Sequence, residues 1–141
     1  MNVLANFPYE MFGDREDYPF DRILTFGPPE GRQVGGELFS YDIPFDPGTG
    51  SIWDLLQLLP RDFEPDCLVF WWPDQDPLPE GLQNCPVPVV GVLSDYNLTL
   101  PYLTRLWPFF DLMLTDTPGV QILGRLPFAR VEPWCQFSFR P

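Results

Sequence analysis

The sequence predicts an α/β fold, a Rossmann-like parallel sheet flanked by helices. Apolar runs without polar alternation are typical of strands buried on both faces, as in parallel sheets. Such runs occur in the second half of the chain, and segments of helical periodicity separate them. They are Cys67–Trp72, Pro86–Leu93 and Asp111–Thr115. Strands that alternate with helices in this way form right-handed crossovers and therefore a parallel sheet.

Turn-forming residues divide the first third of the chain into short elements. Asn2–Phe7 and Ile23–Phe26 are expected as strands, each followed directly by proline or glycine. The stretch Gly27–Gly36 is rich in glycine and proline, and we expect a loop there. Glu37–Ile43 is expected as one further strand.

Along the chain, helices are expected before, between and after the strands of the second half. Ser51 is a good N-cap for a helix in which Ile52, Leu55, Leu56 and Leu59 recur at helical spacing until Pro60. Further along, the pattern predicts one or two helical turns, two helices and a last short strand. In order, these are Asp76–Gln83, Leu98–Phe110, Thr117–Leu126 with Thr117 as N-cap, and Ala129–Glu132.

The composition indicates one folded, acidic domain. The chain has 141 residues, of which 45% are hydrophobic and 16% aromatic, which is too apolar for a disordered chain. The formal net charge is −12, and all the cationic side chains are arginine. A surface this acidic repels phosphate backbones and anionic lipids, so we expect neither a nucleic-acid partner nor binding to a membrane surface.

Absent residue types exclude several kinds of chemistry. The chain has no histidine, which excludes Ser-His-Asp and Cys-His catalysis and histidine metal ligands. It has no lysine, which excludes a Schiff base and a P-loop lysine. Cys67, Cys85 and Cys135 form no C-x-x-C pair, which argues against a zinc site or a disulfide framework. We therefore expect no metal and no cofactor.

The location predicted from the sequence is the cytoplasm. The chain starts Met1-Asn2-Val3-Leu4, without the basic start and long apolar stretch of a signal peptide. Its longest apolar run is far too short to span a bilayer.

The second half of the sequence resembles a known family. The residues of Pro65–Pro133 resemble the N-terminal domains of GT-B glycosyltransferases. The resemblance lies in Pro65-Asp66-Cys67-Leu68-Val69-Phe70-Trp71-Trp72-Pro73, then Pro86–Asn97 with Ser94-Asp95-Tyr96-Asn97 at its end, then Phe110–Asp116 with Gly119-Val120 following. The sequence is most similar to the spore-maturation-protein-like (CgeB-like) group, over about half of the chain.

This resemblance implies a domain organisation and a role. Residues 1–141 would form a single α/β domain, the N-terminal acceptor-side half of a two-domain glycosyltransferase. The C-terminal domain, which binds the nucleotide sugar in such enzymes, would be the missing partner. The expected function is to hold the acceptor that receives a sugar from the nucleotide-sugar donor, without activity of the half alone.

The strongest single candidate for chemistry is Asp95, because it follows a buried strand at the edge where open α/β sheets bind ligands. Its carboxylate would act as a base or bind an acceptor hydroxyl. Tyr96 and Asn97 would hydrogen-bond a sugar from the same loop. Capping of the following turn or helix is nevertheless the interpretation of Asp95 that we favour, because aspartate prefers such positions.

Trp72, Asp74 and Asp116 are further candidates for substrate binding at strand ends. Adjacent tryptophans in a strand face opposite sides of a sheet, so Trp72 or its neighbour Trp71 would offer a stacking platform for a sugar ring. Core packing is the interpretation that we favour for both, given their apolar context. Asp74 belongs to an acidic cluster with Asp76 and Glu80, which indicates either a cation site or, as we favour, a solvated turn.

Asp116 precedes an expected helix N-terminus that would receive an anion, although capping explains it too.

Two other interpretations of the whole chain remain open. One is a non-catalytic α/β binding or protein-interaction module, which the lack of histidine, lysine and a complete catalytic set favours. The other, a receiver-like or flavodoxin-like domain, is disfavoured by the missing lysine and phosphate loop.

Overall fold

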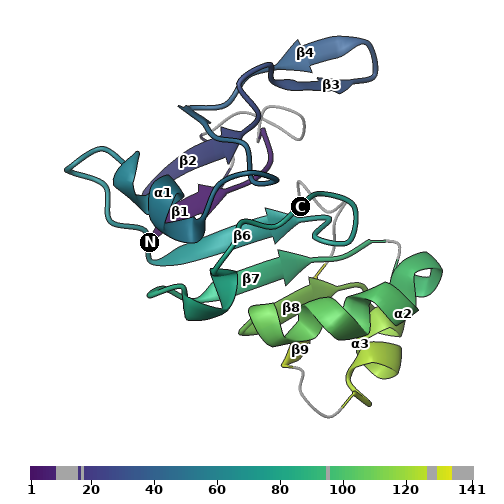
Figure 1. Ribbon diagram of the computed structural model, residues 1–141. Coiled ribbons are helices and arrows are strands. Elements are labelled where there is room, and N and C mark those ends of the chain that lie inside the picture. The colour runs from purple at the N-terminus through teal and green to yellow at the C-terminus, as the bar shows by residue number, and fades with distance from the viewer. Residues whose placement is uncertain (9–15, 17, 95, 127–129, 135–141) are drawn as a thin grey trace.

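The computed structural model describes residues 1–8, 16, 18–94, 96–126 and 130–134. Within these residues, parallel strands form one seven-stranded sheet in the order β5-β2-β1-β6-β7-β8-β9 (Figure 1). The strands are β1 (Asn2–Ala5), β2 (Arg22–Gly27), β5 (Ile43–Pro44), β6 (Cys67–Trp71), β7 (Val89–Val92), β8 (Leu112–Thr115) and β9 (Val131–Pro133). The predicted fold class, a Rossmann-like parallel sheet flanked by helices, is confirmed.

The strand order reverses direction at the centre of the sheet. The chain begins at β1 and moves outward through β2 to β5. It then returns to the other side of β1 with β6 and continues outward to β9. In open α/β sheets, ligands bind beyond the carboxyl ends of the strands at such a switch point. The residues that follow β1 and β6 therefore mark the place where a site is expected.

Both faces of the sheet are buried, as the unbroken apolar runs predict. Leu4 of β1 points into a core cluster that also takes side chains from every described α-helix, while Val3 and Ala5 point into a second cluster on the other face. The helices are α1 (Ile52–Gln57), α2 (Tyr96–Leu106) and α3 (Thr117–Leu123), with the 3₁₀ turns η3 (Leu82–Asn84) and η4 (Trp107–Phe109). The second cluster is filled largely by aromatic rings from the chain around the sheet, among them Phe7, Tyr18 and Trp134.

Helix α1 begins where the sequence predicts. The Ser51 hydroxyl accepts a hydrogen bond from the Asp54 N–H at 3.2 Å, and the Asp54 carboxylate accepts one from the Ser51 N–H at 2.9 Å. This reciprocal capping box satisfies two backbone donors that the first turn leaves open. The helix ends at Gln57, before the stop predicted at Pro60.

A β-hairpin stands where the sequence analysis expected a loop followed by one long strand. β3 (Arg32–Val34) pairs antiparallel with β4 (Glu37–Phe39), so Gly27–Gly36 is only partly a loop and Glu37–Ile43 splits into β4 and β5. Gly35 and Gly36 make the two-residue turn with φ of 59° and 92°. Tight hairpin turns of this kind need positive φ at both positions, which glycine adopts without strain. Figure 1 shows the hairpin projecting beyond β2, away from α2 and α3.

Several predicted boundaries shift. Trp72 lies outside β6, because its φ of 52° breaks the extended backbone. The helical turns predicted in Asp76–Gln83 reduce to η3, and the helix predicted over Leu98–Phe110 becomes α2 followed by η4. The N-cap of α3 is Asp116 rather than Thr117. Among the described helices, none has the length and apolar character needed to cross a membrane.

Candidate functional site

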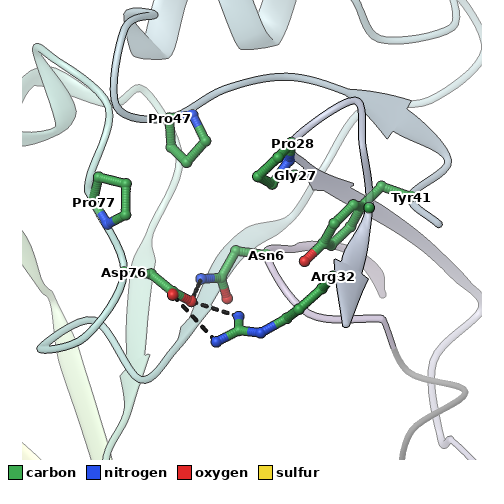
Figure 2. A pocket seen from close by; sticks show the side chains of 9 residues that line it. Asn6, Gly27, Pro28, Arg32, Tyr41, Pro47, Asp76 and Pro77 are labelled. Carbon is green, nitrogen blue, oxygen red and sulfur yellow. Dashed lines mark hydrogen bonds and ion pairs between the residues drawn. The ribbon is translucent and has the colours of Figure 1, made fainter. Parts of the chain in front are cut away.

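A small pocket opens at the switch point of the sheet (Figure 2). Its volume is about 160 Å³, below the roughly 300–1,000 Å³ of sites for drug-sized ligands. It therefore suits one small ring or part of a larger ligand better than a nucleotide sugar. The lining residues come from the ends of β1 and β2, the hairpin and the loops around β5 and β6. They are Asn6, Gly27, Pro28, Gly31, Arg32, Tyr41, Pro47, Asp76 and Pro77.

Asn6 lines the pocket directly after the end of β1. Its backbone N–H donates to the Val69 carbonyl at 3.0 Å, the last backbone bond from β1 to β6. The carboxamide then continues the ladder: its oxygen accepts from the Trp71 N–H at 2.6 Å, and its Nδ2 donates to the Trp71 carbonyl at 3.2 Å. Asn6 is only 6% exposed, so these bonds fix the side chain against the sheet edge.

Arg32 and Asp76 form an ion pair across the pocket. Two guanidinium nitrogens donate to the two carboxylate oxygens, at 2.6 and 3.2 Å, and each side chain is 24% exposed. Asn6 reaches the same carboxylate with its Nδ2 at 3.5 Å from Oδ2. The guanidinium also lies 5.7 Å from the centre of the Trp72 ring. Burial alone would lower the pKa of Arg32, but the hydrogen bonds and charge of Asp76, together with the smaller contribution of Tyr41, outweigh burial and raise it.

Tyr41 closes the pocket on the side of β2. Its ring lies against Gly27, where any side chain would overlap it, so glycine is needed at this position. Figure 2 shows the hydroxyl end of Tyr41 turned toward Arg32. Burial raises the pKa of Tyr41, and the nearby arginine charge only partly opposes that effect. The phenol therefore stays protonated at neutral pH.

Trp72 contacts Arg32 without lining the pocket itself. Its indole N–H donates to the Ser94 hydroxyl at 2.6 Å, which ties the end of β6 to the end of β7. A bulky residue with φ of 52° is strained, and such strain gathers at functional sites. The expectation that Trp71 and Trp72 face opposite sides of the sheet is wrong. The left-handed backbone at Trp72 ends the alternation, and the two rings meet edge to face on the same side, 6.2 Å apart.

The arrangement is suited to binding rather than to proton transfer. The carboxylate in the pocket lining, Asp76, is already held by Arg32 and contacted by Asn6. Within the described part of the chain, no group of three acidic or cysteine side chains is placed to hold a metal ion. The acidic cluster of Asp74, Asp76 and Glu80 is not a fully solvated turn either, because Asp76 is half-buried and ion-paired.

The structure describes only some of the predicted site residues, and these differ in whether they lie at the pocket. Asp95 lies outside the described residues, and so do the side chains of Tyr96 and Asn97, whose backbones begin α2. Asp74 is half-buried in the turn after β6, but the pocket is lined by Asp76 instead. Trp72 contacts the site through Arg32.

Asp116 acts as a helix cap. Its carboxylate accepts a hydrogen bond from the Gly119 N–H at 2.7 Å, at the start of α3. This local bond accounts for its position after β8, and Asp116 does not line the switch-point pocket.

Sequence reasoning missed most of the pocket. Asn6, Arg32 and Tyr41 lie in segments that were expected to be a strand end, a loop and a strand. One signal was available for Asn6, since it is a polar residue that directly follows the first strand of an expected Rossmann-like sheet. Nothing comparable marks Arg32, because its hairpin went unrecognised.

No family model, no curated protein and no solved structure matches this chain.

Proposed function

We propose that the domain binds a sugar acceptor in the switch-point pocket, as the acceptor-side half of a GT-B-type glycosyltransferase. The observation that carries this proposal is the cluster of Asn6, Arg32 and Asp76 beside Trp72 at the carboxyl edge of the central strands. The cluster offers donors and acceptors in fixed positions within a pocket of single-ring size. The resemblance of residues 65–133 to the N-terminal domains of GT-B glycosyltransferases supports the transferase part of the proposal.

A non-catalytic small-molecule binding module is the second candidate. It is favoured by the ion pair, because a carboxylate held by arginine is a poor general base. Both candidates require a ligand in the same pocket. They differ in whether a donor-binding domain must supply the nucleotide sugar.

The first test is a titration of the chain with a panel of neutral methyl glycosides, followed by tryptophan fluorescence and by nuclear magnetic resonance shifts. We expect at least one glycoside to bind in the millimolar range, a free energy of about 4 kcal/mol. Uridine diphosphate should bind more weakly than that glycoside. The pocket is small, and the acidic surface disfavours phosphates. Tighter binding of the diphosphate, or no binding of any glycoside, would overturn the acceptor role.

The chain offers a matched pair of variants for this titration. Arg32→Gln removes the ion pair with Asp76 and the contact with the Trp72 ring. Arg22→Gln removes a similar set far from the pocket, since Arg22 pairs with Asp62 at 3.1 Å and lies over the Phe63 ring at 5.2 Å. Only Arg32→Gln should weaken binding, by about tenfold or more. Equal effects of the two variants would contradict binding in this pocket, and thermal melts show whether each variant is folded.

A further inference from the structure

We propose that the pocket selects an uncharged, hydroxyl-bearing sugar and rejects the same ring when it carries a carboxylate or phosphate. This inference rests on the proposed function, because it names the class of acceptor that the same pocket takes. Three features of the described residues support it: the charge of the lining, the pattern of donors and acceptors, and the rigidity of the ion pair.

The lining carries balanced charge. Arg32 contributes one positive charge and Asp76 one negative charge, in direct contact. Asn6 is neutral, and the phenol of Tyr41 keeps its proton because burial raises its pKa. An anionic ligand has no unpaired cation to meet in this lining. It would have to take the guanidinium from Asp76 while lying next to that carboxylate, and like charges in contact are strongly unfavourable.

The hydrogen-bonding pattern matches a hydroxyl group. The guanidinium of Arg32 has five N–H donors and no acceptor, and the carboxylate of Asp76 has acceptors and no donor. Only some of these are used between them, at 2.6 and 3.2 Å. A ligand group that bridges the two side chains must accept from one and donate to the other. A hydroxyl does both, whereas a carboxylate or phosphate dianion only accepts.

The ion pair is held in place by its surroundings. Trp72 lies against the guanidinium, and Asn6 contacts the carboxylate while it is itself fixed to the Trp71 backbone. Because Asn6 is anchored by two bonds to β6, the carboxylate cannot turn away without losing a contact. Opening the pair to admit an anion therefore costs more than binding a hydroxyl across it.

The test compares two ligands on the unaltered chain. The tightest neutral methyl glycoside from the panel is titrated beside its counterpart with a carboxylate at carbon 6, at pH 7 and low salt. We expect the acidic counterpart to bind at least about tenfold more weakly. The ratio should shrink as salt is raised, because the discrimination is electrostatic. Equal or tighter binding of the acidic ring would overturn this inference and leave the proposed function standing. Failure of every glycoside to bind would instead remove the proposed function.

A variant that removes the negative charge of the pair gives a second test. Asp76→Asn keeps the shape but leaves Arg32 as an unbalanced cation, so the preference for the neutral ring should fall about tenfold or invert. The control is Asp62→Asn, which breaks the exposed pair with Arg22 and should leave the preference unchanged. If the preference of Asp76→Asn equals that of the unaltered chain, the carboxylate does not set selectivity. The measurement on the unaltered chain remains decisive if Asp76→Asn fails to fold.

Discussion

Replacement of Asn6 by alanine should lower the free energy of unfolding by about 2–4 kcal/mol. The carboxamide is buried and makes two hydrogen bonds to the Trp71 backbone, at 2.6 and 3.2 Å. Alanine removes the hydrogen-bond partners of the Trp71 N–H and carbonyl. Each buried backbone group left without a partner costs about 1–3 kcal/mol. Against a typical total of about 5–15 kcal/mol this is a large loss. For a domain of this size it corresponds to a fall in melting temperature of about 10 °C.

Urea unfolding followed by tryptophan fluorescence measures this loss, with circular dichroism as a second probe of the same transition. Asn84→Ala is the matched control, because Asn84 is an exposed asparagine in η3. The control should change stability by no more than about 0.5 kcal/mol. A loss at Asn6 no larger than the loss at Asn84 would refute the reasoning. The carboxamide would then not be extending the β1–β6 ladder.

Two further predictions concern stability. Thr115→Val should raise the melting temperature by a few degrees, since Thr115 is 1% exposed and its hydroxyl has no hydrogen-bond partner among the described residues; a lower value would mean that the hydroxyl is bonded. Ser51→Ala should cost about 1 kcal/mol at pH 7 through loss of the α1 cap. Hydrogen bonds from Ser51 lower the pKa of Asp54, so the part of the cap that depends on the Asp54 carboxylate is present above the ordinary carboxyl value of 3.8 and is lost as pH falls through the lowered pKa. The difference in unfolding free energy between the two proteins should therefore shrink at pH 3, and a constant difference would contradict the capping box.

The central strands of the sheet could be predicted because unbroken apolar runs mark them in the sequence. In β6, Leu68 and Phe70 enter one core cluster, while Cys67, Val69 and Trp71 pack on the other. A strand buried on both faces has no reason to alternate, and that is the pattern read from the sequence. Helix α1 was equally accessible, because its cap and its apolar spacing are local signals.

The hairpin could not be predicted from such local signals. β3 and β4 are three residues each and largely exposed, so no apolar pattern marks them. Their pairing depends on Gly35 and Gly36 adopting positive φ, and glycines without an apolar flank are typical of loops as well. The same weakness applies to Trp72, whose left-handed backbone ends β6 one residue early.

The site is harder to predict than the fold because its residues meet only through the strand order. Asn6 and Asp76 are 70 positions apart, and Arg32 is 44 positions from Asp76. No local pattern marks Asn6 or Arg32 as a site residue. Asp76 is marked only as a member of an acidic cluster, for which the sequence allows either a cation site or a solvated turn. The sequence does not decide between those alternatives, because it does not place Arg32 beside Asp76. The two residues meet only once β2 and β6 lie on either side of β1. A search that starts from the expected switch point and gathers polar residues after the first strand would find Asn6. It would still need the hairpin geometry to find Arg32, and Arg32 is the residue that makes the pocket electrically balanced.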